Sequence, residues 1–309
     1  MDSGIPTPEE YPRLEASAER LSAPVADGVQ SIGLALGGGG ARGFAHIGVL
    51  EVFEASGRWR VAELAGTSAG ALYAAGYAFG LTPADLLRHA RLAPRHRIFR
   101  PRPRAGALIG HQALAEWLTE VFGSARIEDC RIPLTIVATR VRDGATVYLR
   151  EGPLVRAVVA SATIPLVFPP VELDGELLVD GGVSLPVPEL ALRGPWPRVA
   201  VDLGPGPLQR RRLQAPRWWP WAETMALRIP HPHLQAGVLS SLRQNARGYQ
   251  GASGELIIRP AVGSWEDLAY LKTNALVERG RAAARSFLTT LEEAWPQVSA
   301  EAGNEFRPG

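Results

Sequence analysis

Short apolar runs alternate with stretches of helical periodicity along the first half of the chain. Residues 31–36 form an apolar run that leads into four glycines, and residues 44–56 then place apolar side chains at helical spacing. The same pattern recurs at residues 61–65 and 69–79, and residues 133–141 contain a third apolar run. Apolar runs of this length are typical of parallel strands buried on both faces. We therefore predict an α/β fold in which strands and helices alternate around a mainly parallel central sheet.

Two Asp-Gly pairs indicate that antiparallel hairpins extend this sheet. The pairs at residues 143–144 and 174–175 lie between strand-like runs, and Asp-Gly favours the tight turns of hairpins. Residues 198–203 and 255–259 are further candidate strands, and residues 265–293 have the pattern of a closing helical segment.

The two ends of the chain lack such periodicity. Residues 1–28 carry Pro, Ser and Glu, which favours a flexible N-terminal leader, and residues 296–309 resemble a frayed C-terminal tail. We predict one folded domain between them, over residues 29–295.

The N-terminal sequence indicates a cytoplasmic protein. It is acidic and proline-rich, whereas a secretory signal is basic and then apolar. Residues 64–84 carry no charge over a length that could cross a bilayer, but they contain four glycines and Pro83, which favours a buried helix. We expect neither a signal peptide nor a transmembrane segment.

Composition narrows the classes of function. A hydrophobic content of 46% supports a sizeable core in a chain of 309 residues. The net charge of +2 lacks the polycationic character of nucleic-acid binders, so we expect no nucleic-acid partner. The single cysteine, Cys130, excludes an intramolecular disulfide and a cysteine-rich zinc site.

Ser68 lies in a sequence that predicts a nucleophile elbow. Residues 66–70 read Gly-Thr-Ser-Ala-Gly and stand between the second apolar run and the second helical stretch. In a strand-turn-helix elbow, small neighbours let the turn close and present the serine hydroxyl to an ester carbonyl. Ser68 is therefore the candidate nucleophile, although a five-residue motif alone also occurs by chance.

A glycine-rich loop precedes the first helical stretch. Residues 37–43 read Gly-Gly-Gly-Gly-Ala-Arg-Gly, and consecutive glycines let several N–H groups converge beside a helix N-terminus. Such a loop binds an anion, which in acyl transfer is the oxygen of the tetrahedral intermediate. Gly38, Gly40 and Gly43 also match a dinucleotide-binding pattern. However, Glu63, its candidate ribose-binding acid, lies inside a strand-like run rather than at its end.

A third segment places Asp180 directly before two glycines at the end of an apolar run. The glycine loop, the serine motif, the segment SATIPLVF at residues 161–168 and this Asp-Gly-Gly sequence follow one another in a distinctive order. In that order and at these intervals, they resemble the patatin-like phospholipase family over roughly residues 31–205.

The resemblance implies a three-layer α/β/α core and a Ser-Asp dyad that hydrolyses phospholipid or lysophospholipid esters through an acyl-enzyme, without a metal or cofactor. Ser68 would be the nucleophile and Asp180 the general base, with the amides of Gly38, Gly39 and Gly40 as the oxyanion hole. An ordinary aspartate, with a pKa of about 3.9, is a poor base for a hydroxyl, so we expect burial, a direct hydrogen bond and oxyanion stabilisation to compensate. Further residues would support the site: Gly37, Arg42, Gly43, Gly66, Gly70, Gly181 and Gly182. Arg42 would either steady the glycine loop or face a lipid phosphate.

The chain departs from the family pattern at two supporting positions. Leu185 stands where most relatives have an asparagine after Asp-Gly-Gly, and Arg140 stands where an aspartate is common. Neither position belongs to the dyad, so both substitutions bear on substrate preference and turnover rather than on the class of reaction.

Two alternative functions remain open. Ser68, Asp180 and either His231 or His233 follow the chain order of a Ser-His-Asp hydrolase, and an esterase, lipase or thioesterase would need the same catalytic parts. In the second alternative, the glycine loop grips a phosphate in a non-catalytic lipid- or anion-binding module. His46, just after the glycine loop, is interpreted as a packing or capping residue.

Two stretches, residues 94–104 and 208–221, mix arginine with aromatic residues and proline. One interpretation is a solvated loop with packed tryptophans. The other is a surface that meets anionic lipid, because tryptophan beside arginine suits a membrane interface. The second interpretation predicts peripheral membrane contact through Arg210, Arg211, Arg212, Trp218, Trp219 and Trp221.

Overall fold

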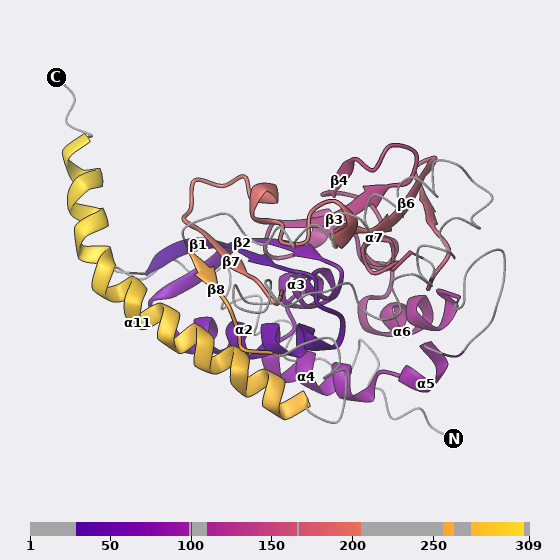
Figure 1. Ribbon diagram of the computed structural model, residues 1–309, viewed down its shortest axis with the longest axis horizontal. Coiled ribbons are helices and arrows are strands. Elements are labelled where there is room, and N and C mark those ends of the chain that lie inside the picture. Colours follow the sequence, from indigo (N-terminus) through magenta and orange to yellow (C-terminus); the bar gives the residue numbers. More distant parts are fainter. Residues whose placement is uncertain are drawn as a thin grey trace, which may run out of the picture.

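A mixed sheet of eight strands forms the centre of the part of the chain that the structure describes (Figure 1). This computed structural model describes residues 29–98, 100, 110–165, 167–204, 256–262 and 273–305. Neighbouring parallel strands follow the order β3 (Leu134–Arg140), β2 (Trp59–Thr67), β1 (Gln30–Leu36), β7 (Arg198–Val201) and β8 (Ile257–Ile258). Antiparallel pairing joins β3 to β4 (Thr146–Leu149) and to β6 (Glu176–Asp180), and joins β6 to β5 (Val171–Leu173).

The observed sheet confirms the fold class and both hairpins that the sequence predicted. The apolar runs coincide with β1, β2 and β3, and the Asp-Gly pairs lie in the turns that join β3 to β4 and β5 to β6. In the second turn, Asp174 and Gly175 have φ values of 51° and 77°. A two-residue type I′ hairpin requires positive φ at both central positions, which explains why the Asp-Gly signal was reliable here.

Helices and short 3₁₀ segments flank this sheet. The α-helices with the given bounds are α2 (Phe44–Ser56), α3 (Ala69–Phe79), α4 (Pro83–Leu92), α5 (Arg95–Ile98), α6 (Gln112–Phe122), α7 (Leu154–Ser161) and α11 (Thr273–Glu305). The 3₁₀ segments are η2 (Gly40–Gly43), η3 (Ile127–Asp129), η4 (Gly181–Val183) and η5 (Glu189–Ala191).

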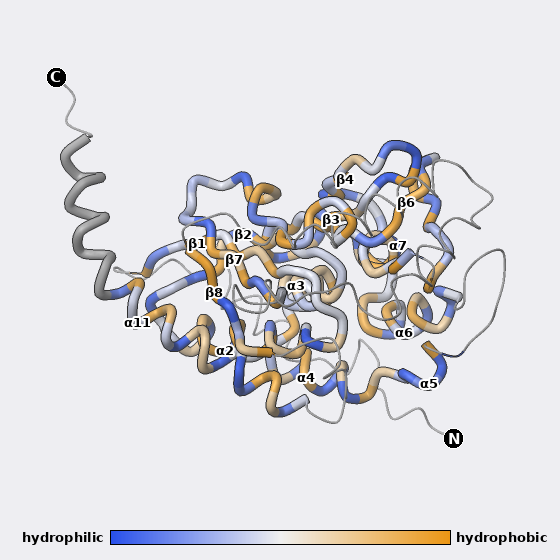
Figure 2. Tube along the Cα trace, viewed as in Figure 1, coloured by the Kyte–Doolittle hydropathy of each residue, from blue (hydrophilic) through white to orange (hydrophobic). Residues whose placement is uncertain are grey.

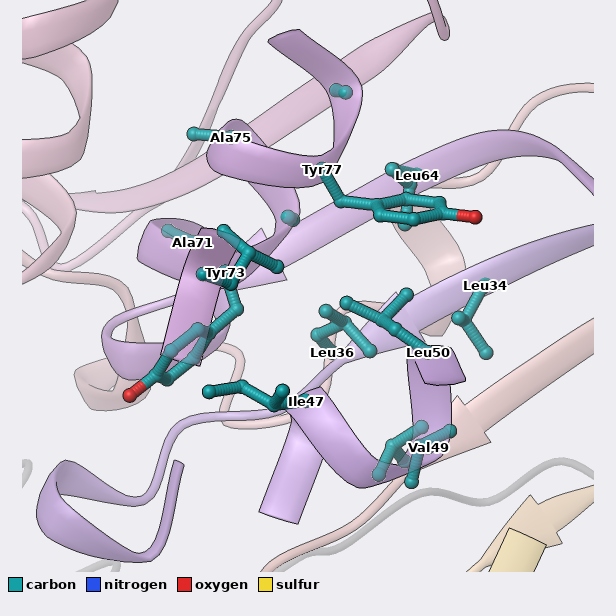
Figure 3. Close-up of a cluster of buried hydrophobic side chains, with 14 of the residues drawn as sticks. Leu34, Leu36, Ile47, Val49, Leu50, Leu64, Ala71, Tyr73, Ala75 and Tyr77 are labelled. Atoms are coloured by element: carbon teal, nitrogen blue, oxygen red, sulfur yellow. The ribbon is translucent and has the colours of Figure 1, made fainter. Parts of the chain in front are cut away.

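One face of the sheet carries large side chains that pack against helices. Leu34, Leu36 and Leu64 are fully buried in one cluster with Ile47 and Leu50 of α2, as Figure 3 shows. In Figure 2, hydrophobic stretches of the chain lie near the labels β1 and β7 in the centre of the molecule. Burying a leucine side chain stabilises a fold by about 1.5–3 kcal/mol, so this face supplies much of the driving force for folding.

Successive strand residues point to opposite sides of a sheet, so the residues between these leucines lie on the opposite face. The side chains on that face are smaller. Ala35, Ala65 and Val137 pack there with Ala191 and Leu192, at the end of η5. A short 3₁₀ segment can therefore approach the sheet closely on this side.

Helix α11 lies along α2 with close backbone contact, and it continues past the sheet toward the C-terminus (Figure 1). A Cβ atom added to Gly280 would lie 2.0 Å from the Ala45 carbonyl oxygen, and one added to Gly48 would lie 2.0 Å from the Val277 carbonyl oxygen. Real Cβ atoms do not approach oxygen this closely, so the absence of side chains at these two glycines allows the helices to meet.

Replacing Gly280 with alanine should destabilise the protein by about 1–3 kcal/mol, because the added methyl overpacks the contact between α2 and α11. Urea unfolding would measure the change in the free energy of unfolding. Gly110→Ala is the matched control, since a Cβ atom there meets no atom of the described residues within 4 Å. We expect the control to change stability by less than about 0.5 kcal/mol. Equal stability of the Gly280 variant and the wild type would contradict the tight contact.

The end of α11 differs from the prediction. The sequence pattern predicted a helical segment over residues 265–293 and a tail from residue 296. Residues 265–272 lie outside the described residues, and the described part of α11 runs from Thr273 to Glu305, through the beginning of the predicted tail. Alanine and glutamate recur beyond residue 293 and favour helix, whereas Pro296 and Gly303 in the same stretch disfavour it and led to the predicted tail. Periodicity therefore predicted a helix in this part of the chain but not where it ends.

Candidate active site

Ser68 occupies a strained turn between β2 and α3. Its φ and ψ angles are 55° and −122°, and Asp174 is the other non-glycine residue with positive φ in the described part of the chain. Helix α3 begins at the next residue and lies very close to β1. A Cβ atom at Gly70 would lie 2.0 Å from the Leu36 carbonyl oxygen, so the turn can close only with glycine there. Strain of this kind is typical of a nucleophile elbow.

Asp180, at the end of β6, meets the nucleophile candidate directly. Ser68 Oγ donates a hydrogen bond of 2.7 Å to Asp180 Oδ2, across 112 positions of sequence. The Gly182 N–H donates to the other carboxylate oxygen, Oδ1, at 2.7 Å. The main chain of Asp180 is also held by two hydrogen bonds. The Asp180 N–H donates to the Thr163 carbonyl at 2.8 Å, and Thr139 Oγ1 donates to the Asp180 carbonyl at 2.9 Å.

The environment of Asp180 makes it a better base than an exposed aspartate. Asp180 is buried, with only 7% of its surface exposed. Burial raises the pKa of the carboxyl to about 6, although the hydrogen bonds from Ser68 and Gly182 favour the ionised form. A base with a pKa closer to neutrality accepts a hydroxyl proton more readily and is still ionised at pH 7.

The direct contact between Ser68 and Asp180 also bears on the triad alternative. In a Ser-His-Asp triad, the histidine lies between the serine and the aspartate. Here the carboxylate itself accepts the serine hydrogen bond. His231 and His233, the histidines considered for a triad, lie outside the described residues.

The glycine loop lies beside the elbow, between β1 and α2. A Cβ atom at Gly38 would lie 3.4 Å from Ser68 Cβ. The Gly38 N–H donates to the Pro186 carbonyl at 2.9 Å, and the Gly37 N–H donates to the Val201 carbonyl at 3.0 Å. Among the described residues, no acceptor binds the N–H of Gly39 or of Gly40, whose φ is 54°. These two amides are therefore uncommitted within the described part of the chain, as is the N–H of Ala69, the residue after Ser68.

The amide of the nucleophile candidate is not available in the same way. Ser68 N–H donates to Ser161 Oγ at 2.9 Å. An oxyanion hole that used this amide would first have to break that bond.

Buried side chains hold the glycine loop in place. Arg42 is 5% exposed and its Nε donates to the Gly39 carbonyl at 3.3 Å. His46 Nε2 lies 2.8 Å from the Gly37 carbonyl, and because a carbonyl only accepts, the proton is on Nε2. Burial lowers the pKa of His46 to about 4, so the ring is neutral at pH 7 and acts as a structural donor.

The remaining supporting residues are close to the same centre. A Cβ atom added to Gly43 would meet Ala69 and Tyr73 of α3, and one added to Gly181 would meet the Val137 carbonyl. Gly66 likewise lies against the backbone at the start of α3. The structure thus brings all four sequence segments together around Ser68.

Comparison with known proteins agrees with this assembly of segments. The family model for patatin-like phospholipases matches residues 34–193. This chain belongs to the patatin-like phospholipase family. The patatin-like match spans every segment of the site, from the glycine loop to the Asp-Gly-Gly sequence.

Several patatin-like relatives and one solved structure are similar to the chain. An uncharacterized NTE family protein of Mycobacterium tuberculosis is 36% identical over 166 residues, which cover 53% of this chain and 46% of that protein. Lysophospholipase NTE1 of Eremothecium gossypii is 28% identical over 85% of this chain and 18% of its own length. Lysophospholipase NTE1 of Saccharomyces cerevisiae is 34% identical over 57% of this chain and 11% of its own length. VipD from Legionella pneumophila superposes with a TM-score of 0.48 and 14% identity, over 86% of this chain and 67% of that one. The chain spans less than half the length of the curated relatives it matches.

The two departures from the patatin-like pattern have structural roles here. Arg140 forms ion pairs with Asp143 at 2.9 Å and with Glu176 at 3.9 Å, at the outer end of β3. Leu185 packs against the small-residue face of the sheet, and its carbonyl accepts from Thr67 Oγ1 at 3.0 Å. Leu185 therefore holds the residue next to Ser68 through its main chain, which any residue could supply.

Sequence reasoning missed several residues that shape the site. Ser161 and Thr163 contact the main chains of Ser68 and Asp180, yet they entered the sequence analysis only as part of the segment SATIPLVF. Glu63, considered as a ribose-binding acid, accepts from the N–H groups of Arg193 and Gly194 at 2.7–3.0 Å. Its carboxylate thus holds the chain after η5 rather than facing the glycine loop.

The described helices bear on the membrane predictions only in part. None of them combines the length and the apolar character needed to cross a bilayer. The arginines at 210–212 and the tryptophans at 218, 219 and 221, predicted to meet a membrane surface, lie outside the described residues.

Proposed function

We propose that this chain hydrolyses carboxylic esters of phospholipids or lysophospholipids, with Ser68 as nucleophile and Asp180 as general base. The observation that carries the proposal is the 2.7 Å hydrogen bond from Ser68 Oγ to a buried carboxylate, beside glycine amides that have no acceptor among the described residues. These are the three parts that acyl transfer requires: a nucleophile, a base and an oxyanion site.

In the acylation step, Asp180 Oδ2 accepts the hydroxyl proton while Ser68 Oγ attacks the ester carbonyl carbon. The carbonyl oxygen becomes an oxyanion that accepts hydrogen bonds from the glycine loop. When the tetrahedral intermediate collapses, the bond to the alkoxy group breaks, and protonated Asp180 returns the proton to the leaving alcohol. The acyl group remains on Ser68 as an ester.

In the deacylation step, Asp180 accepts a proton from a water molecule that attacks the acyl carbon. A second tetrahedral intermediate forms in the same oxyanion site and collapses with Ser68 Oγ as the leaving group. Asp180 returns the proton to Ser68, and the fatty acid is released. The proton balance closes within the dyad, so the cycle needs no further acid or base.

The oxyanion donors in this proposal are chiefly Gly39 and Gly40. Gly38 was predicted as a third donor, but its N–H is committed to the Pro186 carbonyl at 2.9 Å. Gly38 can join the other two only if that bond opens when substrate binds. One oxyanion donor typically contributes about 10²–10³ in rate, so two available amides are a substantial part of the site.

The lipid substrate class rests on the family and on the names of the fungal relatives, which are lysophospholipases. A cytoplasmic enzyme that meets membranes peripherally, through the arginines and tryptophans of residues 208–221, belongs to the same proposal. The lysophospholipase and phospholipase A alternatives differ only in whether one or two acyl chains are present on the substrate.

The proposal is tested by incubating the purified full chain with lysophosphatidylcholine, phosphatidylcholine and a short-chain p-nitrophenyl ester. Product lipids are then identified by mass spectrometry. We expect the two phospholipids to yield a fatty acid and an alcohol that carries the headgroup. The relative rates on lysophosphatidylcholine and phosphatidylcholine then distinguish a lysophospholipase from a phospholipase A. A binding module would bind lipid vesicles yet release no product from any of the three substrates.

A His231→Ala/His233→Ala variant should keep its rate, whereas a triad enzyme would lose several orders of magnitude.

A further inference from the structure

The end of α7 and the residues directly after it contact both members of the proposed dyad. Helix α7 ends at Ser161, whose side chain is fully buried. Ser161 Oγ donates to the Val137 carbonyl at 2.6 Å and accepts from the Ser68 N–H at 2.9 Å. Because a carbonyl can only accept, the hydroxyl hydrogen is directed at Val137, and a lone pair is left to face the Ser68 amide.

Two residues later, the same segment holds the base. The Thr163 carbonyl accepts from the Asp180 N–H at 2.8 Å. Thr163 is itself fully buried, and its Oγ1 donates to the Val159 carbonyl of α7 at 2.7 Å. A rigid turn at the end of α7 therefore joins Ser68 to Asp180 through their main chains, in addition to the direct hydrogen bond between their side chains.

The elbow needs an external acceptor at this position. Ser68 has backbone angles that L-residues seldom adopt, and helix α3 begins only at the next residue. Its N–H therefore has no helical acceptor, and a buried N–H without a partner is costly. The Ser161 hydroxyl satisfies that amide and links it to β3, which runs beside β2 in the sheet.

We propose that Ser161 is a positioning residue for the hydrolysis proposed above, on which this inference rests. Its hydroxyl fixes the peptide between Thr67 and Ser68, so that Ser68 Oγ stays within hydrogen-bond distance of Asp180. It also keeps the Ser68 amide from donating to the oxyanion. Thr163 complements it by fixing the main chain of Asp180 from the same turn.

Ser161→Ala should lower kcat roughly 10- to 100-fold while KM changes less than about twofold, because it removes orientation rather than substrate contacts. The rate is expressed per reactive site, counted by titrating Ser68 with a fluorophosphonate. A merely structural role would reduce the number of titratable sites and leave kcat per site unchanged. Ser161→Cys keeps the side-chain volume but offers a weak acceptor, so it should fold where alanine fails and still lose about tenfold in kcat.

Ser56 provides the matched control. Its Oγ donates to the Phe53 carbonyl at 2.8 Å and accepts from the Trp59 N–H at 3.2 Å, at the opposite end of β2 from Ser68. Ser56→Ala therefore removes the same two kinds of hydrogen bond, and we expect a loss of stability with kcat per site unchanged. The inference is overturned if the Ser161 variants keep kcat within about threefold of the wild type, or if Ser56→Ala loses as much. Wild-type protein without any Ser68-dependent turnover would instead overturn the proposed function, and the inference with it.

Discussion

Ser68→Ala should lower kcat/KM for ester hydrolysis by about 10⁴-fold or more, because it removes the atom that forms the acyl-enzyme. What remains is the uncatalysed attack of water, helped only by the oxyanion site and by substrate binding. The variant loses one hydroxyl that bonds to Asp180 and keeps the hydrogen bond from its own N–H to Ser161. It should therefore fold like the wild type.

The measurement combines the initial rate on a p-nitrophenyl ester with mass spectrometry of the intact protein after fluorophosphonate treatment. Wild-type protein should gain one phosphonyl group, and Ser68→Ala should gain none. Circular dichroism and urea unfolding confirm that the variant is folded. Turnover that survives in folded Ser68→Ala protein would remove this serine from the mechanism.

The parts of the fold that could be predicted are those where local sequence and tertiary environment agree. A strand buried on both faces is typically rich in apolar residues, and β1, β2 and β3 are each mostly apolar, although β2 also contains Glu63. Glycine is required where the elbow closes at Gly70, so the motif around Ser68 reports a backbone geometry directly. Asp180 could be placed because it ends a strand-like run and precedes two glycines.

The parts that could not be predicted depend on contacts between distant segments. Nothing local to Pro186 shows that its carbonyl accepts the Gly38 N–H, which limits the role of Gly38 as an oxyanion donor. Ser161 is an ordinary serine at the end of an amphipathic helix, and its proposed role depends on the packing of α7 against α3 and β3. Glu63 has an apolar neighbourhood in sequence, and its partners lie about 130 residues away.

Both members of the proposed dyad make the fold less stable than it could be. Ser68 holds a strained backbone conformation, which typically costs about 1–3 kcal/mol. Asp180 is buried, and the loss of solvation makes its ionised carboxylate unfavourable. Residues retained at such cost are expected at functional sites, and removing the cost should raise stability while activity falls.

Asp180→Asn should lower kcat/KM by about 10³–10⁴-fold at pH 7, because an amide cannot accept the proton of Ser68. The hydrogen-bonding pattern around the side chain can persist. The amide oxygen accepts from the Gly182 N–H, and the NH₂ group donates to Ser68 Oγ, which then acts as acceptor. In the wild type, kcat/KM should rise with pH through about 6, as the pKa of Asp180 implies, and the variant should lack this rise. A pH-independent wild-type rate between pH 5 and pH 7, or an active asparagine variant, would show that another group is the base.

The same substitution should raise stability in a pH-dependent manner. The folded protein binds the Asp180 proton more tightly than the unfolded chain, since burial raises its pKa from 3.8 to about 6. Raising the pH through this range therefore weakens the wild-type fold, and the loss is complete above the folded-state pKa. Asparagine does not titrate, so Asp180→Asn should match the wild type near pH 4 and exceed it by about 3 kcal/mol above pH 7. Urea unfolding across this pH range measures the difference. Ser68→Ala retains Asp180, so its free energy of unfolding should keep the pH dependence of the wild type. A difference in stability between Asp180→Asn and the wild type that does not change with pH would show that Asp180 is not a buried, ionisable base.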